Sequence, residues 1–220
     1  MPRITALESQ QRTAERINVF LDGEFAFGLA AITAQQAGLH IGRTLSQAEI
    51  DDLLVKDNFQ KAFNRALILL GYRPRSEDEV RRRLLKAKVE PPIVDNVVER
   101  LREDGLLDDM AFAKYWAENR DAFNPRGTRL LSLELRQKGV DRAVIDEALD
   151  GTVDEAESAL AAGRRRLKRW SALEYREFRQ KMGTYLARRG FAYDTARQAV
   201  DQLWQESRGE GPEEEFTEAD

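Results

Sequence analysis

Apolar and polar residues alternate over the first thirty residues of the chain, which is the pattern of β-strands rather than helices. The alternation runs through residues 17–21 and resumes through residues 25–29. Between them, Asp22-Gly23 supplies the two positive-φ residues of a tight hairpin turn. Residues 4–8 are suited to a third strand. A bare hairpin is marginal in water, so this predicted element must pack on helices or on a partner.

From about residue 30 onward, the spacing of apolar residues changes to the 3.6-residue period of helices. Three such apolar faces comprise Phe59, Phe63, Ala66, Leu67 and Leu70; Tyr175, Phe178, Met182, Tyr185 and Leu186; and Ala196, Ala199, Val200, Leu203 and Trp204. Four helix starts are indicated by a Ser/Thr-x-x-Glu capping box. These boxes are Ser46–Glu49, Ser76–Glu79, Thr152–Glu155 and Ser171–Glu174.

The helical part repeats itself at an offset of 51 residues. Apolar residues and helix breakers match at this offset in several places: Leu84, Leu135 and Leu186; Val89, Val140 and Phe191; Lys88, Gly139 and Gly190; and Pro74-Arg75 with Pro125-Arg126. We interpret the pattern as three repeats of about fifty residues, each a long helix followed by two shorter ones. Arrays of this kind are elongated and offer a long binding surface.

The fold class predicted is therefore mainly α, with tandem three-helix repeats in an elongated array after a short N-terminal β-hairpin. The predicted divisions are the hairpin at 1–29, the first repeat at 30–104, the second at 105–151, the third at 152–208 and an acidic, disordered tail at 209–220.

Composition excludes several kinds of active site. The 220 residues contain no cysteine and one histidine, His40, so thiolate chemistry, disulfides and His-rich metal sites are excluded. No phosphate-binding glycine loop is present. Asp108-Asp109 is better suited to capping a helix than to holding a metal or driving hydrolysis. Neither a signal peptide nor a membrane span is indicated, so we predict a cytoplasmic protein. Because no catalytic motif is found either, we expect that it is not an enzyme, and we further expect a monomer.

Charge is distributed unevenly along the chain. The formal net charge is −4, yet residues 209–220 hold six acids and no base, whereas residues 160–190 hold ten bases and two acids. Solvated helix faces explain such runs in part. Triple arginines, however, extend around more than half a helical turn, so one or two must point away from any core. The candidate partner-binding residues are Arg81, Arg82, Arg83, Arg164, Arg165, Arg166, Arg169, Arg188 and Arg189.

Several motifs between residues 16 and 207 together resemble the RecX family. They are RPRSE at 73–77, GLLDD at 105–109 with Phe112-Ala113, Arg126-Gly127, and LELRQKGV at 133–140. The resemblance implies tandem three-helix repeats and a regulator of the bacterial RecA recombinase. Members of the family bind the RecA filament in its helical groove and suppress ATP hydrolysis and strand exchange, without catalysis or a cofactor of their own.

Two functions are therefore kept open. The first is a regulator that binds RecA and its DNA filament, with the basic arginines contacting protein carboxylates or DNA phosphates. The alternative is a helical module that binds single- or double-stranded DNA directly, as helix-turn-helix domains do. The acidic overall balance favours the first, because dedicated DNA-binding domains are usually strongly basic.

Overall fold

The structure, a computed structural model, describes residues 1–10 and 13–209. The chain divides into two compact units, Met1–Leu107 and Asp108–Asp220. The acidic tail predicted at 209–220 lies, beyond Gly209, outside the described residues.

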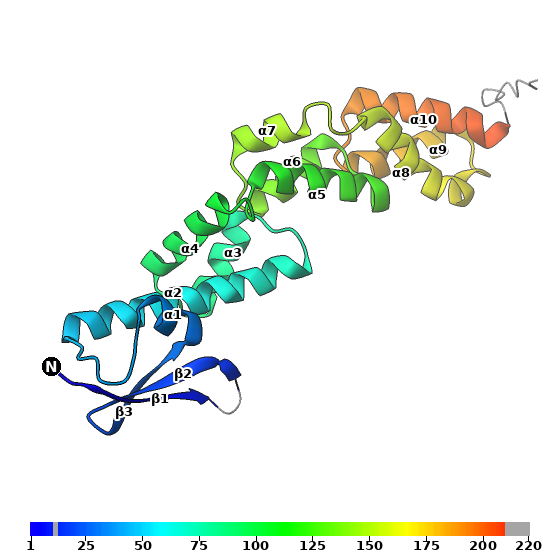
Figure 1. The fold of residues 1–220 in the computed structure, drawn as a ribbon. Coiled ribbons are helices and arrows are strands. Elements are labelled where there is room, and N and C mark those ends of the chain that lie inside the picture. The colour runs from blue at the N-terminus through cyan, green and yellow to red at the C-terminus, as the bar shows by residue number, and fades with distance from the viewer. Residues whose placement is uncertain (11–12, 210–220) are drawn as a thin grey trace, which may run out of the picture. The chain divides into compact units, whose positions relative to one another are not determined.

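The first unit begins with a three-stranded antiparallel sheet in the order β1-β2-β3 (Figure 1). The strands are β1 (Ile4–Gln10), β2 (Thr13–Leu21) and β3 (Glu24–Ala30). Asp22 and Gly23 have φ values of 48° and 92°, so the predicted hairpin turn is confirmed. The third strand predicted near residues 4–8 is also present.

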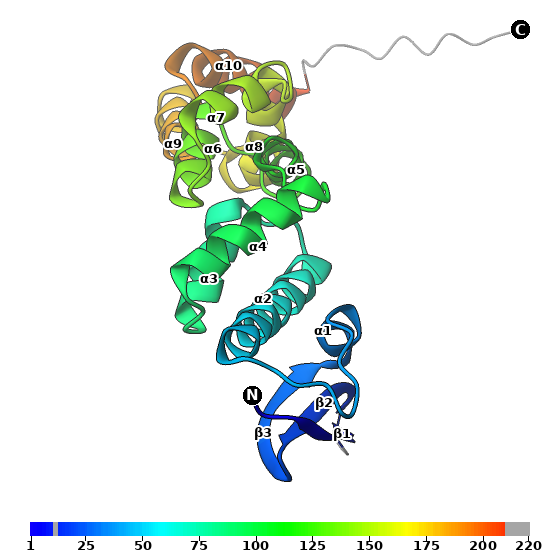
Figure 2. The ribbon, with the colours of Figure 1, turned by 60° about the vertical axis from the view of Figure 1, so that its left-hand side comes forward.

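One face of this sheet packs against helix α2 (Gln47–Tyr72). A short helix, α1 (Ala31–Gln36), follows β3 directly, and residues 37–46 are not helical. Helical structure begins near residue 30, as predicted, and is interrupted in this stretch, where Gly38 and Gly42 adopt positive φ and the chain returns to the sheet. Figure 2 shows α2 between the sheet with α1 on one side and α3 with α4 on the other.

Apart from α1, the helices of the described residues form three groups of three: α2–α4 in the first unit, and α5–α7 and α8–α10 in the second. The remaining bounds are α3 (Glu77–Lys86), α4 (Pro91–Glu103), α5 (Asp109–Phe123), α6 (Thr128–Gln137), α7 (Arg142–Leu149), α8 (Glu155–Trp170), α9 (Tyr175–Arg188) and α10 (Tyr193–Arg208). The predicted triple repeat is confirmed. One detail differs, because α8 and α10 each have 16 residues, so the third repeat does not begin with its longest helix.

The second helix of each repeat ends in the same way, and this explains the 51-residue period. Lys88, Gly139 and Gly190 follow α3, α6 and α9 with φ values of 62°, 80° and 87°. The amide after each of them donates to the carbonyl five residues earlier; Val89 N–H, for example, lies 3.2 Å from Leu84 O. This is a Schellman motif, in which a left-handed residue satisfies the last free carbonyls of a helix. The equivalent leucines at 84, 135 and 186 are completely buried.

Each repeat encloses its own apolar core. In the third, the predicted faces of α9 and α10 pack on α8, with Phe178, Met182 and Leu203 fully buried. In the first, Ala62 and Ala66 of α2 are buried against α3 and α4. The predicted face of α2 is less complete, because Leu67 remains 37% exposed.

Of the four predicted capping boxes, Ser46–Glu49 forms in full, and Ser76 caps its helix start as expected. The Ser46 side chain accepts a hydrogen bond from Glu49 N–H, and the Glu49 carboxylate accepts one from Ser46 N–H at 2.8 Å. The hydrogen bonds that the Ser46 N–H and hydroxyl donate to the Glu49 carboxylate hold the pKa of Glu49 below its usual value. Ser76 caps α3 by accepting from Glu79 N–H at 3.2 Å.

The other two predicted boxes are wrong. Helix α8 is capped by Asp154, whose carboxylate accepts from two amides, while the Thr152 hydroxyl donates to the Ala148 carbonyl of the preceding helix. Helix α9 starts after Glu174, which makes no side-chain cap, and Ser171 instead ends α8. A carboxylate two residues further on therefore replaces the threonine as the cap of α8.

A buried carboxylate joins the sheet to α2. Asp57 is 1% exposed, and one of its oxygens accepts from Ala30 N–H at 2.6 Å. The other lies 2.6 Å from Lys61 Nζ and 3.2 Å from Arg16 Nη2. Burial raises the pKa of Asp57, but the hydrogen bonds from Lys61, Ala30 N–H and Arg16 outweigh it and keep the pKa below its usual value. No sequence pattern indicated this residue.

Candidate partner-binding surfaces

The arginine triplet of α3 divides between internal ion pairs and an open groove. Arg81 pairs with Asp95 of α4, and Arg82 pairs with Asp78 one turn earlier in α3. Arg83 lines a groove beside α2 and makes no ion pair within the part of the chain that the structure describes. Only Arg83 of this triplet is thus available to an acidic partner without breaking an ion pair.

In α8, Arg164 joins the helix to α10. Its guanidinium donates to both carboxylate oxygens of Glu206, at 3.1 and 2.8 Å, and to Glu157 at 3.0 Å. Hydrogen bonding to Arg164 lowers the pKa of Glu206, and the same hydrogen bond raises the pKa of Arg164. This bidentate geometry is the strong form of an arginine–carboxylate pair. It makes Arg164 a stabilising residue of the third repeat.

Arg165 and Arg189 bind backbone carbonyls near the end of α5. Arg165 donates to Phe123 O at 2.6 Å and to Ala122 O at 3.2 Å. Arg189 donates to Pro125 O at 2.8 Å and to the Asn124 side chain at 2.7 Å. Cations at a helix C-terminus satisfy its free carbonyls and interact favourably with its dipole. Both arginines thereby hold the second and third repeats together.

The remaining candidates of the third repeat point toward solvent. Arg166 is exposed and lies 5.5 Å from the Tyr185 ring, which also contacts Arg189 at 4.9 Å. Arg169 and Arg188 are exposed and make no ion pair among the described residues. The structure thus brings Arg166 and Arg189 together around Tyr185, whereas Arg164 and Arg165 are directed to other partners.

The groove beside Arg83 was not indicated by the sequence. It has a volume of about 1450 Å³ and lies entirely within the first unit, along the exposed side of α2. Six basic and two acidic residues line it. The basic residues are Arg16, Lys61, Arg65, Arg83, Lys86 and Lys88. The signal that could have shown it is the spacing of Lys61, Arg65, Ile68 and Tyr72, which places four side chains on one face of α2.

Asp108 and His40, the two residues considered from the sequence for metal binding or catalysis, have structural roles or surroundings that involve neither. Asp108 caps α5 by accepting from Met110 and Ala111 N–H at 2.8 and 3.0 Å, as predicted. His40 is exposed and its Nδ1 lies 3.1 Å from Gly38 O. Across residues 1–10 and 13–209, no cluster of three His, Asp or Glu residues could hold a metal ion. In the same part of the chain, no helix is long and apolar enough to cross a membrane.

These features define a tandem three-helix-repeat protein with a small N-terminal sheet and basic exposed surfaces. Four domain models of one family match the chain in order. They are "Regulatory protein RecX N-terminal domain" at residues 2–46, then the first, second and third three-helix domains of RecX at 62–101, 108–149 and 154–200. The chain belongs to the RecX family.

Relatives and solved structures agree with this assignment. "Regulatory protein RecX" of Bacillus subtilis (strain 168) is 35% identical over 205 residues, which cover 92% of this chain and 78% of the relative. The protein of the same name from Listeria monocytogenes serovar 1/2a (strain ATCC BAA-679 / EGD-e) is 29% identical over 93% of this chain and 77% of its own length. A crystal structure of regulatory protein RecX, 28% identical, matches with a TM-score of 0.75 over 91% of this chain and all of that one.

Proposed function

We propose that this protein regulates the RecA recombinase by binding RecA and its DNA filament, and that it suppresses ATP hydrolysis and strand exchange without catalysis of its own. The observation that carries this proposal is the ordered match of four RecX domains along the chain. Two relatives, each 35% identical over more than nine-tenths of this chain, are named regulatory proteins.

The surface chemistry is consistent with a binding role. Guanidinium groups recognise carboxylates and phosphates through the same planar fork, and a nucleoprotein filament exposes both groups. The proposed partner-binding residues divide by their geometry. Arg83, Arg166, Arg169 and Arg188 are the principal contacts, because their guanidinium groups make no internal salt bridge among the described residues. Arg81 and Arg82 are secondary contacts, since each would have to leave an exposed ion pair.

Arg164, Arg165 and Arg189 act indirectly in this proposal. Each is bonded to another helix or to a neighbouring repeat, so each stabilises the surface that carries the principal contacts. Exposed ion pairs contribute only about 0–1 kcal/mol each, so single substitutions of the principal contacts have small effects and combined substitutions larger ones.

The test is the DNA-dependent ATPase of RecA. Substoichiometric amounts of the protein should lower it, while the protein alone hydrolyses no ATP. A variant with Arg169→Glu and Arg188→Glu should inhibit less, most clearly at low salt where screening is weak. A variant with Lys114→Glu, an exposed charge reversal outside the proposed contacts, is the control. Unchanged RecA ATPase at equimolar protein would contradict the proposal.

Direct DNA binding is the second candidate, supported by the basic helices of three-helix units. Titration against bare DNA and against a RecA–DNA filament separates the two. Equal affinity for both, with a steep dependence on salt, would favour the DNA-binding module. A marked preference for the filament is the result expected of a RecA regulator.

A further inference from the structure

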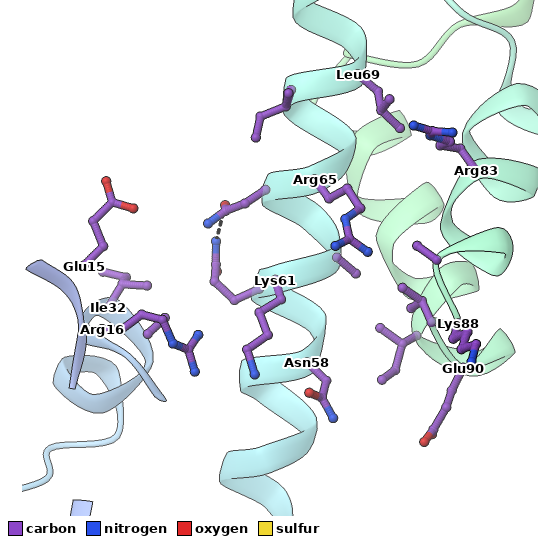
Figure 3. Close-up of a pocket in the computed structure, with 18 of the residues that line it drawn as sticks. Glu15, Arg16, Ile32, Asn58, Lys61, Arg65, Leu69, Arg83, Lys88 and Glu90 are labelled. Carbon is purple, nitrogen blue, oxygen red and sulfur yellow. Dashed lines mark hydrogen bonds between the residues drawn. The ribbon is translucent and has the colours of Figure 1, made fainter. Parts of the chain in front are cut away.

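The groove of the first unit has a floor and two walls (Figure 3). The floor is the outer face of α2, where Lys61, Arg65, Ile68 and Tyr72 follow one another along the helix. One wall comes from β2 and α1, and the other from the end of α3 and the turn into α4. The groove is apolar as well as basic, because Ile68 and Tyr72 are 63% and 81% exposed.

Only part of the positive charge in this groove is paired within the described part of the chain. Arg16 and Lys61 are bound to the buried Asp57. By contrast, Arg65, Arg83 and Lys88 make no ion pair within the described part of the chain. Figure 3 shows Arg65 and Arg83 directed into the space between α2 and α3. Two like charges facing one open space favour an anionic ligand there.

The second repeat provides an internal comparison for the positions of Arg65 and Arg83. At the offset of 51 residues, Arg65 and Arg83 correspond to Trp116 and Glu134. In the second repeat, the Trp116 indole N–H donates to the Glu134 carboxylate at 2.8 Å, and Arg120 donates to the same carboxylate at 2.9 Å. In the second repeat, a carboxylate at this place thus pairs with a cation of the same repeat. The first repeat has Arg83 in place of that carboxylate, and neither Arg83 nor Arg65 makes an ion pair among the described residues.

Lys88 gives an independent indication at the rim of the groove. It has a φ of 62°, and the equivalent residues of the other two repeats are glycines, Gly139 and Gly190. A left-handed conformation is unfavourable for lysine and free of strain for glycine. An exposed residue held in such a conformation points to a function of its side chain. The lysine places one more cation beside Arg65 and Arg83.

We propose that this groove binds an acidic segment of a partner protein, with carboxylates on Arg65, Arg83 and Lys88 and an apolar side chain against Ile68 and Tyr72. The inference deepens the proposed function and rests on it for the expectation of a protein partner. Single-stranded nucleic acid is less well matched, because such sites stack several bases on aromatic rings, and among the described residues Tyr72 is the one aromatic residue that lines this groove. Exposed isoleucines are instead suited to aliphatic or aromatic side chains of a protein.

The test uses the full chain and three fluorescein-labelled probes at one salt concentration. The first is a peptide of about 12 residues that alternates Glu or Asp with Leu and Phe, as for a segment in an apolar groove. The second has Ser in place of Leu and Phe, and the third is an oligothymidine of equal length. The first peptide should bind most tightly. Tighter binding of the oligothymidine, lost in the groove variants, would overturn the proposal in favour of a nucleic-acid site.

Four variants locate the binding. Arg65→Glu and Arg83→Glu should each weaken the first peptide about tenfold, since each replaces an attraction by a repulsion. Ile68→Ser should weaken binding of the first peptide and leave the affinity for the Ser-containing peptide unchanged. Lys88→Gly relieves backbone strain, so it should remain folded while still weakening the first peptide about threefold. Lys114→Glu, an exposed residue of α5, is the control and should change nothing. Equal binding by all variants would overturn the proposal.

Inhibition of the RecA ATPase is measured with the same variants, so that the two proposals fail separately. Loss of peptide binding with full RecA inhibition would mean that the groove serves a partner other than RecA. Peptide binding in a protein that leaves RecA unaffected would retain the groove and contradict the proposed function.

Discussion

Gly127 and Gly190 bring the backbones of two repeats into direct contact. Gly127 N–H donates to Arg189 O at 3.0 Å, and a Cβ built on Gly127 would lie 2.3 Å from Gly190 O. Gly127 has a φ of −69°, which any residue adopts, so space rather than conformation requires glycine there. The close approach positions Arg189 for its hydrogen bonds to Pro125 O and Asn124.

Replacing Gly127 by alanine should therefore destabilise the second unit. Neighbouring backbone atoms cannot move away as a flexible side chain can, so we expect a loss of about 3 kcal/mol, at the upper end of the usual cost of overpacking. Urea denaturation with an unchanged m-value measures the effect. Gly183→Ala is the control, because nothing lies within 4 Å of its Cβ position. Alanine inside a helix should there stabilise by about 0.5–1 kcal/mol.

Asp57 should make the first unit sensitive to acid. Its pKa in the folded protein lies below the ordinary value of 3.8, so its contribution is complete above that value and is lost as the pH falls through the folded pKa. At pH 7, Asp57→Asn should cost about 2 kcal/mol, less than the usual cost of breaking a fully buried pair, because Lys61 and Arg16 are partly exposed.

Unfolding free energies at neutral and strongly acidic pH check this prediction. The difference between the parent and Asp57→Asn should shrink as the pH falls below 3.8. Asp52→Asn removes an exposed ion pair with Lys56 and should have almost no effect at either pH. A difference for Asp57→Asn that grows on acidification would show that the folded pKa is raised rather than lowered.

Arg165 and Arg169 lie on one helix and should separate stability from binding. Arg165→Ala removes hydrogen bonds to two carbonyls at the end of α5 and should lower stability by about 1 kcal/mol. Arg169→Ala should change stability by less than about 0.5 kcal/mol, as for other exposed positions. In the RecA ATPase assay, under conditions where both variants are fully folded, Arg169→Ala should reduce inhibition more than Arg165→Ala does. A larger binding defect for Arg165→Ala would assign the contact to that residue instead.

Lys88→Gly should stabilise the protein. Relief of the left-handed backbone gains about 1–2 kcal/mol, and the extra freedom of glycine in the unfolded chain takes back about 0.5–1 kcal/mol. The net gain of about 0.5–1 kcal/mol is measurable by thermal or urea denaturation. Lys88→Ala retains the strained conformation and should give no gain. A gain from alanine equal to that from glycine would trace the effect to the lysine side chain.

Much of the fold could be predicted from the sequence because its determinants are local. The two-residue alternation and Asp22-Gly23 define the hairpin within about fifteen residues of chain. The repeat followed from buried leucines and from the residues after each second helix, whose backbone conformation is set by neighbours only five residues away. Asp108 was recognised as a cap on the same local grounds.

What the sequence did not show depends on contacts between distant segments. In the sequence, Asp57 resembles an ordinary polar residue of a helix. It is buried because Ala30 and Arg16, which lie 27 and 41 residues earlier in the chain, pack against it. Arg165 reads as part of a basic run, yet its partners are carbonyls at the end of α5, 42 and 43 residues earlier. Charge patterns therefore located the basic segments without revealing which cations are already bound.

The three Schellman turns also bear on how the chain folds. Each turn closes within six residues, so it can form before any distant part of the chain has been brought near. Proteins rich in such short-range contacts fold fast, in about microseconds to milliseconds. The link from Asp57 to the sheet must instead close a loop of 27 residues to Ala30. Helix pairs such as α3–α4 should thus act as early nuclei, with the attachment of the sheet to α2 as a later step of folding.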